Sequence, residues 1–409
     1  MSGRRVLVVG AGAGGDAAAE ALRKAGFDGE VVLVGRDPHP AYHRPYLSKQ
    51  FLRGELPLDR VRLRRADDYQ RLDIEWLGER SAVAASRRDS SVTLDDGRVL
   101  AYDTLVLATG GRPRWPNTIP RLGNVFALRT LDDGVALKQA LDEARRPLII
   151  GAGFIGAEVA ASARMQGKEP ILVELAPVPL ARALGEEMGR VYARIHRERG
   201  VDLRLSTTVD EWIPNGDRVD AVRLSDGTRE EVDLVLVAVG IEPELALVRD
   251  LELPEAAGGV AVDATLRARD GVYCAGDIAA HLHPVFGRHL RVEHWQVARK
   301  QGQAIGQAIA GEPAAYEELP WFWSDQYDVN LQYLGNAAAF DQTVWRGDPN
   351  GEKFAVFYLQ EGRVQAVLAV NEGRSIRFSR DLIASQARVA PEALADEGGD
   401  LREVARQAQ

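Results

Sequence analysis

The chain has 409 residues, of which 45% are hydrophobic and 27% charged, and its formal net charge is −9. This length suggests two or three domains with sizeable cores. The negative charge argues against general nucleic-acid binding, which depends on neutralising phosphates with Lys and Arg. The single cysteine, Cys274, excludes an internal disulfide and a cysteine-based metal cluster, and fits a reducing compartment. No apolar run approaches a membrane span, and the N-terminal run is too short for a signal peptide, so a cytoplasmic location is expected.

The first predicted unit is a strand, a glycine-rich turn, a helix and a second strand. Residues 6–9 and 31–34 are apolar runs typical of buried parallel strands, and 16–27 has helical spacing. Between the first strand and the helix stands Gly10-x-Gly12-x-x-Gly15. The first glycine permits a tight turn, the second lets a pyrophosphate approach the backbone, and the third lets helix and strand pack closely. Phosphates would meet free N–H groups at the helix N-terminus, so a dinucleotide site is predicted.

The same unit recurs as a strand at 148–150, the turn Gly151-x-Gly153-x-x-Gly156, a helix at 157–167 and a strand at 171–173. Two such turns indicate two dinucleotides, most economically a flavin and a nicotinamide. Glu174 ends the second strand, where a carboxylate accepts from a ribose 2′-OH and repels a 2′-phosphate. NADH is therefore favoured over NADPH, the alternative being a solvated glutamate at a strand end.

In the first unit the ribose position is open between Arg36 and Asp37. Further strands are predicted within 104–113, 233–244 and 271–279, and Asp277 is expected to open a helix that points positive charge at a flavin. The pair His281-x-His283 falls in a predicted loop, and no metal site is expected. From about residue 320 the pattern becomes that of strands, with a hairpin turn at Glu361-Gly362 and a charged helical tail.

Several motifs stand in one order along the chain: GAGAGG, YHRPYLSK, LVLATGGRPR, LRTLDD, GAGFIGAE, YCAGDIA, RVEHWQVARKQG and PWFWSDQ. On these motifs the whole chain resembles the FAD-dependent, NADH-linked ferredoxin reductases that serve aromatic-ring dioxygenases and bacterial cytochromes P450. The apoptosis-inducing-factor-like oxidoreductases share most of the pattern. The resemblance implies an α/β, glutathione-reductase-like fold with two doubly wound (Rossmann-like) domains and a C-terminal α+β domain. The implied limits are 1–111 and 243–318 for the FAD domain, 112–242 for the NADH domain and 319–409 for the last.

The resemblance also assigns roles to the segment 40–51, which lies where related enzymes carry redox cysteines. Arg44 and Lys49 would contact FAD, and Glu158 would be the salt-bridge partner of Lys49; these two form the predicted catalytic pair. A lysine there would stabilise the negative charge of reduced flavin. The alternative is a surface lysine and a helix-facing glutamate. The sequence departs from the family at Tyr46, where a second proline is common, and at Arg36, where an acid is usual.

The implied FAD contacts are Gly10, Gly12, Ala13, Gly14, Gly15, Arg36, Asp37, Arg44, Pro45, Lys49, Ala82, Ala108, Thr109, Gly110, Arg129, Asp277, Glu293, His294, Trp295 and Trp323. The implied NADH contacts are Gly151, Gly153, Phe154, Ile155, Gly156, Glu174, Arg182 and Gly240.

The implied function is hydride transfer from NADH to FAD, then one-electron transfer to a [2Fe-2S] ferredoxin that feeds a cytochrome P450 or a ring-hydroxylating dioxygenase. Rubredoxin reductase and an apoptosis-inducing-factor-like oxidoreductase with another acceptor are the alternatives. Disulfide and peroxide reductases are disfavoured because they need a cysteine near position 45. The ferredoxin is expected to be acidic and the reductase a monomer or weak dimer. The predicted docking residues, which could instead form a solvated helix face, are Arg288, Arg291, Arg299 and Lys300.

Overall fold

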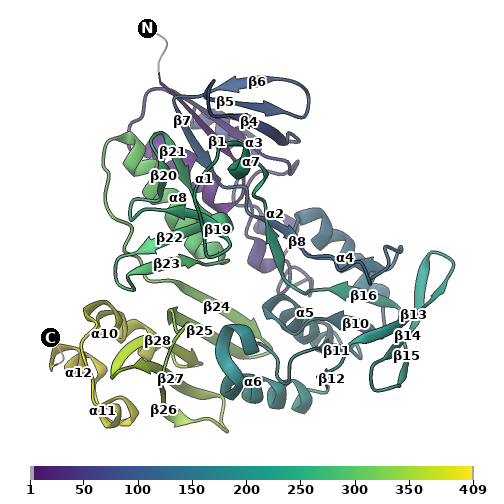
Figure 1. Cartoon of the computed structure of the whole chain (residues 1–409). Coiled ribbons are helices and arrows are strands. Elements are labelled where there is room, and N and C mark those ends of the chain that lie inside the picture. Colours follow the sequence, from purple (N-terminus) through teal and green to yellow (C-terminus); the bar gives the residue numbers. More distant parts are fainter. Residues whose placement is uncertain (1–3, 408–409) are drawn as a thin grey trace.

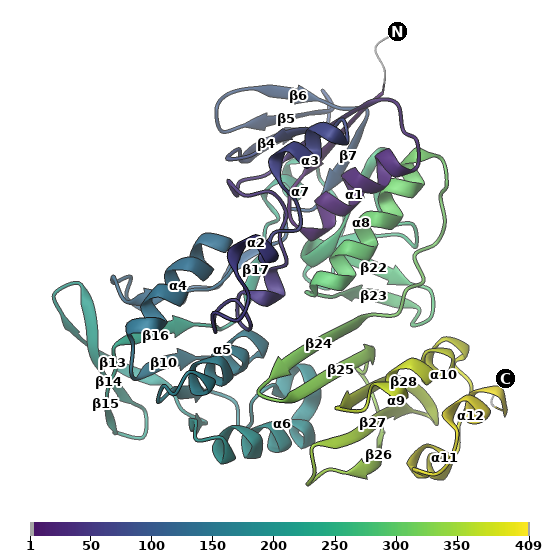
Figure 2. The same ribbon diagram turned by 180° about the vertical axis from the view of Figure 1, so that it is seen from behind.

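In the computed structural model, residues 4–407 fold into three parts, each built around its own main sheet (Figures 1 and 2). The two N-terminal parts carry parallel sheets covered by helices, and the third carries an antiparallel sheet. The predicted α/β fold class, with two doubly wound units and a C-terminal α+β part, is thereby confirmed.

The first part contains a six-stranded sheet whose central strands are buried on both faces. Its order is β20 (Arg267–Arg269), β21 (Val272–Cys274), β7 (Thr104–Leu107), β1 (Arg5–Val9), β2 (Glu30–Val34) and β3 (Glu75–Leu77). All neighbours pair in parallel except β20 and β21. Helices α1 (Ala13–Lys24) and α8 (Trp295–Ala310) pack side by side next to this sheet. The sheet is covered on both faces, so its central strands need apolar side chains on both sides. This explains the continuous apolar run at residues 6–9.

Two smaller sheets complete the first part. One has the order β4 (Ala82–Ser86), β5 (Ser91–Leu94) and β6 (Val99–Ala101); the other has β18 (Glu255–Ala256), β19 (Gly259–Val262), β22 (Ala279–His283) and β23 (Arg288–Arg291). Short helices α2 (Leu58–Val61), α3 (Ala66–Arg71) and α7 (Ala246–Asp250) lie in the connections.

The second part repeats the parallel arrangement. Its sheet has the order β12 (Asp202–Leu205), β11 (Ile171–Glu174), β10 (Pro147–Ile150), β16 (Leu234–Val237) and β9 (Val125–Phe126). Its helices are α4 (Leu131–Glu143), α5 (Phe154–Met165) and α6 (Ala181–Glu198), and a separate sheet holds β13 (Val209–Asn215), β14 (Arg218–Leu224) and β15 (Arg229–Glu231). The chain enters and leaves this part through the antiparallel pair β8 (Gly111–Pro113) and β17 (Ile241–Pro243). The predicted limits at 111 and 242 fall within this pair, and the remaining domain limits stay predictions.

The third part is a five-stranded antiparallel sheet followed by short helices. The order is β24 (Trp321–Gln326), β25 (Val329–Gly335), β28 (Arg363–Val370), β27 (Lys353–Gln360) and β26 (Gln342–Asp348). The helices are α9 (Gly373–Phe378), α10 (Arg380–Ser385), α11 (Pro391–Ala395) and α12 (Leu401–Gln407). Glu361 and Gly362 join β27 to β28 with φ values of 50° and 77°, so the predicted hairpin turn is confirmed.

Two predictions about the segment that follows β21 were wrong. Gly276–Ile278 is a single 3-10 turn, and Asp277 does not open an α-helix. His281 and His283 lie in β22 and not in a loop, because that segment pairs with β19 on one side and β23 on the other. Within residues 4–407, no group of three or more His, Cys, Asp and Glu side chains could hold a metal, and no helix is long and apolar enough to cross a membrane.

The buried His281 gives the fold a specific sensitivity to acid. Its side chain is 2% exposed, and burial, with the neighbouring His283, lowers its pKa from 6.5 to about 4. The unfolded chain therefore binds a proton at this histidine before the folded chain does, so stability is lost as the pH falls from about 6.5 towards 4.

We expect His281→Phe to reduce the stability lost between pH 7 and pH 5 by about 2 kcal/mol, because the variant has no imidazole to protonate on unfolding. Urea unfolding at several pH values measures this. Tyr316, whose ring lies 5.2 Å from that of His281, supplies the control, since Tyr316→Phe should keep the wild-type pH dependence. Parallel stability curves for wild type and His281→Phe would show that His281 does not contribute to the stability lost in acid.

Candidate active site

A cavity of about 1430 Å³ extends between the three parts and reaches both glycine turns. This exceeds the usual 300–1,000 Å³ of a pocket for one small ligand. Every residue of the predicted FAD and NADH sets lines it except Gly15 and Gly156, and Glu158 lines it as well. The fold therefore brings the predicted FAD and NADH residues to one cavity. The contact of each residue with a cofactor stays a prediction.

The first glycine turn is shaped by positions where no Cβ fits. Gly10 has φ +110°, and a Cβ there would lie 2.1 Å from the carbonyl oxygen of Ala108. A Cβ on Gly15 would lie 1.8 Å from the carbonyl oxygen of Gly10, which explains why this residue packs the turn and does not line the cavity. Gly12 lies at the cavity and is the residue before α1, so the first N–H groups of the helix open towards the cavity.

The second turn has the same construction. Gly151 has φ +96°, and a Cβ on Gly156 would lie 1.9 Å from the carbonyl oxygen of Gly151. Glu174, at the end of β11, accepts hydrogen bonds from Ala152 N at 2.6 Å and from Ala176 N at 2.8 Å. These bonds hold the Glu174 carboxylate beside the second turn, where the sequence places a ribose.

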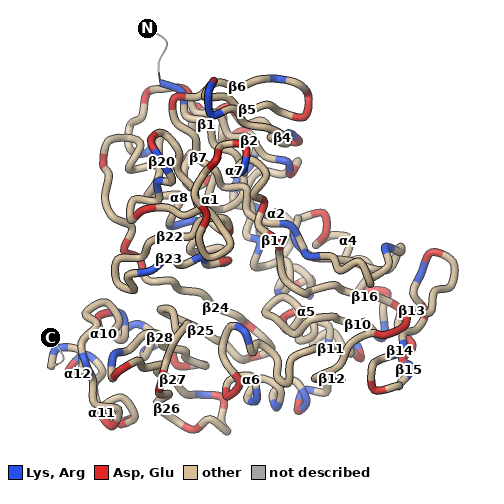
Figure 3. The backbone as a smooth tube through the Cα atoms, in the orientation of Figure 1, with Lys and Arg blue, Asp and Glu red and all other residues tan. Residues whose placement is uncertain are grey.

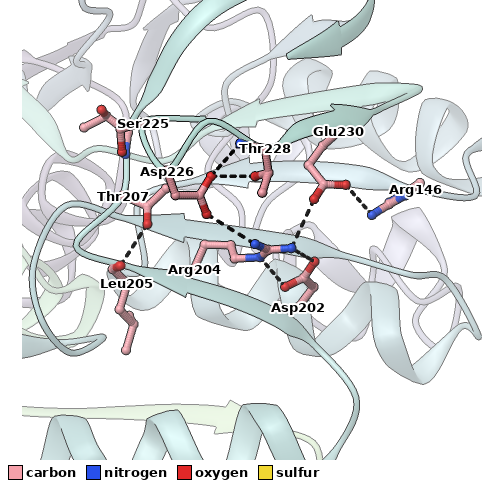
Figure 4. A network of polar contacts seen from close by, with 10 residues as sticks. Arg146, Asp202, Arg204, Leu205, Thr207, Ser225, Asp226, Thr228 and Glu230 are labelled. Carbon is pink, nitrogen blue, oxygen red and sulfur yellow. Dashed lines mark hydrogen bonds and ion pairs between the residues drawn. The ribbon is translucent and has the colours of Figure 1, made fainter. Parts of the chain in front are cut away.

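A polar network links β12 to the β14–β15 hairpin (Figure 4). Arg204 on β12 pairs with Asp226 at 3.4 Å and Glu230 at 3.1 Å, which ties the parallel sheet to the β14–β15 hairpin. Thr207, which lines the cavity, donates its backbone N–H to the carbonyl oxygen of Glu174 at 3.0 Å. The network thus holds the wall of the cavity around Glu174 in place.

In the first unit, the two candidate ribose residues have other partners. Asp37 accepts from the backbone N of His39 at 3.0 Å and from the Tyr42 hydroxyl at 2.8 Å. Arg36 is 68% exposed at its side chain and lies 3.5 Å from the Glu244 carboxylate. Both line the cavity, and the choice between them stays open.

Two buried donors in the cavity lack a hydrogen-bond partner within residues 4–407: Arg44 Nε and Trp295 Nε1. Nearby, Arg129 donates to Asp277 at 2.6 Å, and burial together with the charge of Arg44 lowers the pKa of Arg129. Two arginines and unsatisfied donors favour an anionic ligand rich in acceptors. A flavin with its pyrophosphate fits this set of side chains.

Lys49 and Glu158 form a buried ion pair at the cavity. The Nζ to Oε2 distance is 3.0 Å, and the side chains are 3% and 6% exposed, so the surface alternative is excluded. The segment that carries Lys49 packs against the second part: Leu47 and Phe51 share a core cluster with Leu137 of α4. The position of Lys49 therefore depends on contacts between the first two parts.

Two serines complete the surroundings of Glu158, and the sequence analysis missed both. Ser48 donates to the same oxygen as Lys49, and Ser324 of β24 donates to Oε1 at 2.7 Å. A hydroxyl in a strand 166 positions away gives no sequence signal that it meets a particular carboxylate. In this strand the sequence analysis had predicted one site residue, Trp323, which precedes Ser324 and also lines the cavity.

An aromatic group closes the cavity between α5 and β24. His294 stacks on Phe322 with ring centroids 4.0 Å apart, and Phe154 meets Phe322 edge-on at 5.0 Å. Desolvation lowers the pKa of His294 to about 4, against the opposing effect of the Asp277 charge. A neutral imidazole therefore lies in this wall at physiological pH.

The predicted docking residues are not equally available. Arg291 is 13% exposed at its side chain and donates to the carbonyl oxygens of Asp277 and Ala257 and to Glu293. Arg299 is 22% exposed at its side chain and lies 3.9 Å from a Glu20 oxygen. Arg291 and Arg299 each face a carboxylate within the molecule, that of Glu293 and that of Glu20. Arg288 donates to the neutral side-chain amide of Asn336 at 2.7 Å, which does not balance its charge, so Arg288 stays a docking candidate together with Lys300.

These features are those of a class of oxidoreductases: two glycine turns of the dinucleotide-binding type open into one cavity, which a buried lysine–glutamate pair also lines. The chain belongs to the pyridine nucleotide-disulphide oxidoreductase family, whose match covers residues 4–302, and residues 321–405 match the reductase C-terminal family.

Among its relatives, the ferredoxin–NAD(+) reductase component of the anthranilate 1,2-dioxygenase system of Burkholderia cepacia is 40% identical, with 97% of this chain and 98% of the relative covered. Putidaredoxin reductase of Pseudomonas putida is 35% identical, with 98% and 96% covered. The reductase in the covalent putidaredoxin reductase–putidaredoxin complex superimposes with a TM-score of 0.94 at 34% identity, with 100% and 99% covered. The chain is thus a member of the ferredoxin–NAD(+) reductases, which confirms the resemblance found in the sequence.

Close packing of α8 behind the first glycine turn provides a test of the site's construction. A Cβ on Gly302 would lie 2.0 Å from the carbonyl oxygen of Gly14, which lines the cavity. We expect Gly302→Ala to lower the free energy of unfolding by about 1–3 kcal/mol, since the clash outweighs the better helix propensity of alanine. It should also lower the FAD content of the purified protein.

Urea unfolding and flavin absorbance measure the two effects. Gln307→Ala, at an exposed position of the same helix, is the control and should change neither. If Gly302→Ala matches Gln307→Ala in both measurements, α8 does not constrain the turn.

Proposed function

We propose that this chain is a cytoplasmic reductase that transfers electrons from NADH, through FAD, to an acidic [2Fe-2S] ferredoxin serving an oxygenase. The supporting observation is that one cavity is lined by both glycine turns and by the Lys49–Glu158 ion pair. FAD and NAD(H) are the cofactors of the reductases to which the chain belongs. The cytoplasmic location rests on the presence of one cysteine in the chain.

When bound, FAD accepts a hydride from NADH and can release its electrons singly. The ammonium of Lys49 lies at the cavity and would stabilise negative charge there, and Glu158 keeps that ammonium in place. The stacked rings of His294 and Phe322 exclude water from one wall without adding a charge.

The only cysteine offers no internal acceptor. Cys274 is fully buried in β21, and burial raises the pKa of its thiol well above the usual range. The electrons must therefore leave to an external partner, and an iron–sulfur protein accepts them one at a time. Cytochrome c reduction that depends on added [2Fe-2S] ferredoxin tests the proposal, and equal rates without ferredoxin would contradict it.

The choice of nicotinamide nucleotide should depend on Glu174. Removing its carboxylate loses a charge-assisted hydrogen bond to the ribose and a repulsion of the 2′-phosphate. We expect Glu174→Ala to narrow the NADH over NADPH preference in kcat/KM by about 1–3 kcal/mol. The exposed Glu169, in the same part of the chain, is the control, because Glu169→Ala should leave the ratio as in wild type. An unchanged ratio in Glu174→Ala would assign the choice to another residue.

The acidic partner should dock through local positive charge, because the chain as a whole carries −9. Figure 3 shows basic and acidic residues distributed over all three parts, so docking depends on a small group of charges. We expect Arg288→Glu with Lys300→Glu to slow ferredoxin-dependent cytochrome c reduction roughly tenfold at low salt and to flatten its salt dependence.

Ferricyanide reduction by NADH should survive in this double variant, because it needs no protein partner. Arg223→Glu with Arg229→Glu, at exposed positions of β14 and β15, makes the same change in net charge and is the control. If both variants slow the ferredoxin reaction equally, docking does not use Arg288 and Lys300.

A further inference from the structure

A chain of buried hydrogen bonds leads away from Glu158 through the C-terminal part to α6. Ser324 Oγ lies 2.7 Å from Glu158 Oε1, and Gln326 Nε2 lies 3.2 Å from Ser324 Oγ. His196 Nε2 lies 3.0 Å from Gln326 Oε1, and the Tyr327 hydroxyl lies 3.0 Å from His196 Nδ1. The side chains of Ser324, Gln326 and His196 are 0% exposed, so no water competes for these contacts.

The chemistry of the groups fixes the direction of each bond. Burial lowers the pKa of His196 to about 4, so the ring is neutral and carries one N–H. Gln326 Oε1 can only accept, so His196 donates from Nε2 and accepts from Tyr327 at Nδ1. The Gln326 amide then donates to Ser324 Oγ, and the serine hydroxyl is left to donate to Glu158.

All four donors in the chain therefore point towards one carboxylate. Aligned hydrogen bonds of this kind strengthen one another in a low-dielectric interior. Glu158 also receives Lys49 and Ser48 on its other oxygen, Oε2. Lys49 and Ser48 thus hold Oε2, while within residues 4–407 Ser324 supplies the side-chain hydrogen bond to Oε1.

We propose that Ser324 is a positioning residue for electron transfer: it holds Glu158 in one rotamer, and through Glu158 it holds the Lys49 ammonium at the cavity. Gln326 and His196 orient the serine hydroxyl. The C-terminal part, which carries Ser324, thereby acts on the flavin site through the carboxylate of Glu158 in the second part. This role rests on the proposed function, because it requires FAD to bind beside Lys49.

Replacing Ser324 by alanine leaves Oε1 buried without its donor, which costs a charged group more than a neutral one. The Glu158 carboxylate can then rotate, and the Lys49 ammonium is no longer held in one position. The reduced, negatively charged flavin would be less stabilised, so its midpoint potential should become more negative.

The test uses holoenzyme of Ser324→Ala, Ser324→Thr and Ser379→Ala. Ser379 is 0% exposed and lies in the same part of the chain, and its Oγ has no partner within residues 4–407, so it matches the size and burial of the change. Single-turnover reduction by NADH, the flavin midpoint potential and the flavin absorbance spectrum are measured for each variant.

We expect Ser324→Ala to reduce the flavin roughly tenfold more slowly than wild type and to shift the potential downward, while Ser324→Thr restores both because it keeps the hydroxyl. Gln326→Met, which keeps the side-chain length, should shift both in the same direction by a smaller amount.

Equal rates, potentials and spectra for Ser324→Ala and Ser379→Ala would overturn the positioning role. Failure of Ser324→Thr to restore them would also overturn it, because the hydroxyl would then not be the acting group. Wild-type protein that binds no FAD would instead overturn the proposed function, so the two failures are distinguishable.

Discussion

The burial of the Glu158 carboxylate is the constraint on which the arrangement of the three parts depends. A buried charge that loses a partner destabilises a protein strongly. Its partners come from the segment before α2, which carries Ser48 and Lys49, and from β24, which carries Ser324. Glu158 itself lies on α5 of the second part. None of the three parts can move relative to the others without breaking a hydrogen bond to this one group.

The segment 40–51 shows how packing and charge cooperate. Its apolar side chains, such as Leu47 and Phe51, share a core cluster with α4, and Ser162 of α5 donates to the carbonyl oxygen of Ser48. These contacts hold the backbone on either side of Lys49, so only the rotamer of the lysine remains to be fixed by Glu158. This segment thus brings a lysine to the cavity, while the single cysteine of the chain, Cys274, is buried in the core.

The glycine turns impose a second constraint, through the backbone and not through side chains. Gly15 and Gly156 each lie where a Cβ would touch the carbonyl oxygen of the first glycine of their turn. This contact brings the start of each helix against its strand, so the helix N-termini open at the cavity. Gly302 of α8 likewise packs so closely on the carbonyl oxygen of Gly14 that no Cβ would fit between them. Helix α8 thereby supports the first turn.

The sequence by itself determined the elements and motifs whose causes are local. Both glycine turns, the strands that flank them and the Glu361-Gly362 hairpin follow from residue types at fixed spacing. The predicted FAD and NADH residues came from ordered motifs that resemble a known family, and all of them except Gly15 and Gly156 line the cavity. Local patterns failed after Asp277, which lies in a 3-10 turn: the expected α-helix does not form, because the residues that follow pair as β22 with β19 and β23. Charge in the sequence also did not reveal that the guanidinium of Arg291 is hydrogen-bonded inside the molecule. Only the tertiary structure decided that Ser48 and Ser324 bond to Glu158, and that His196 bonds to Gln326. These hydrogen bonds join residues more than a hundred positions apart. Such bonds depend on packing, so no periodic pattern in the sequence indicates them.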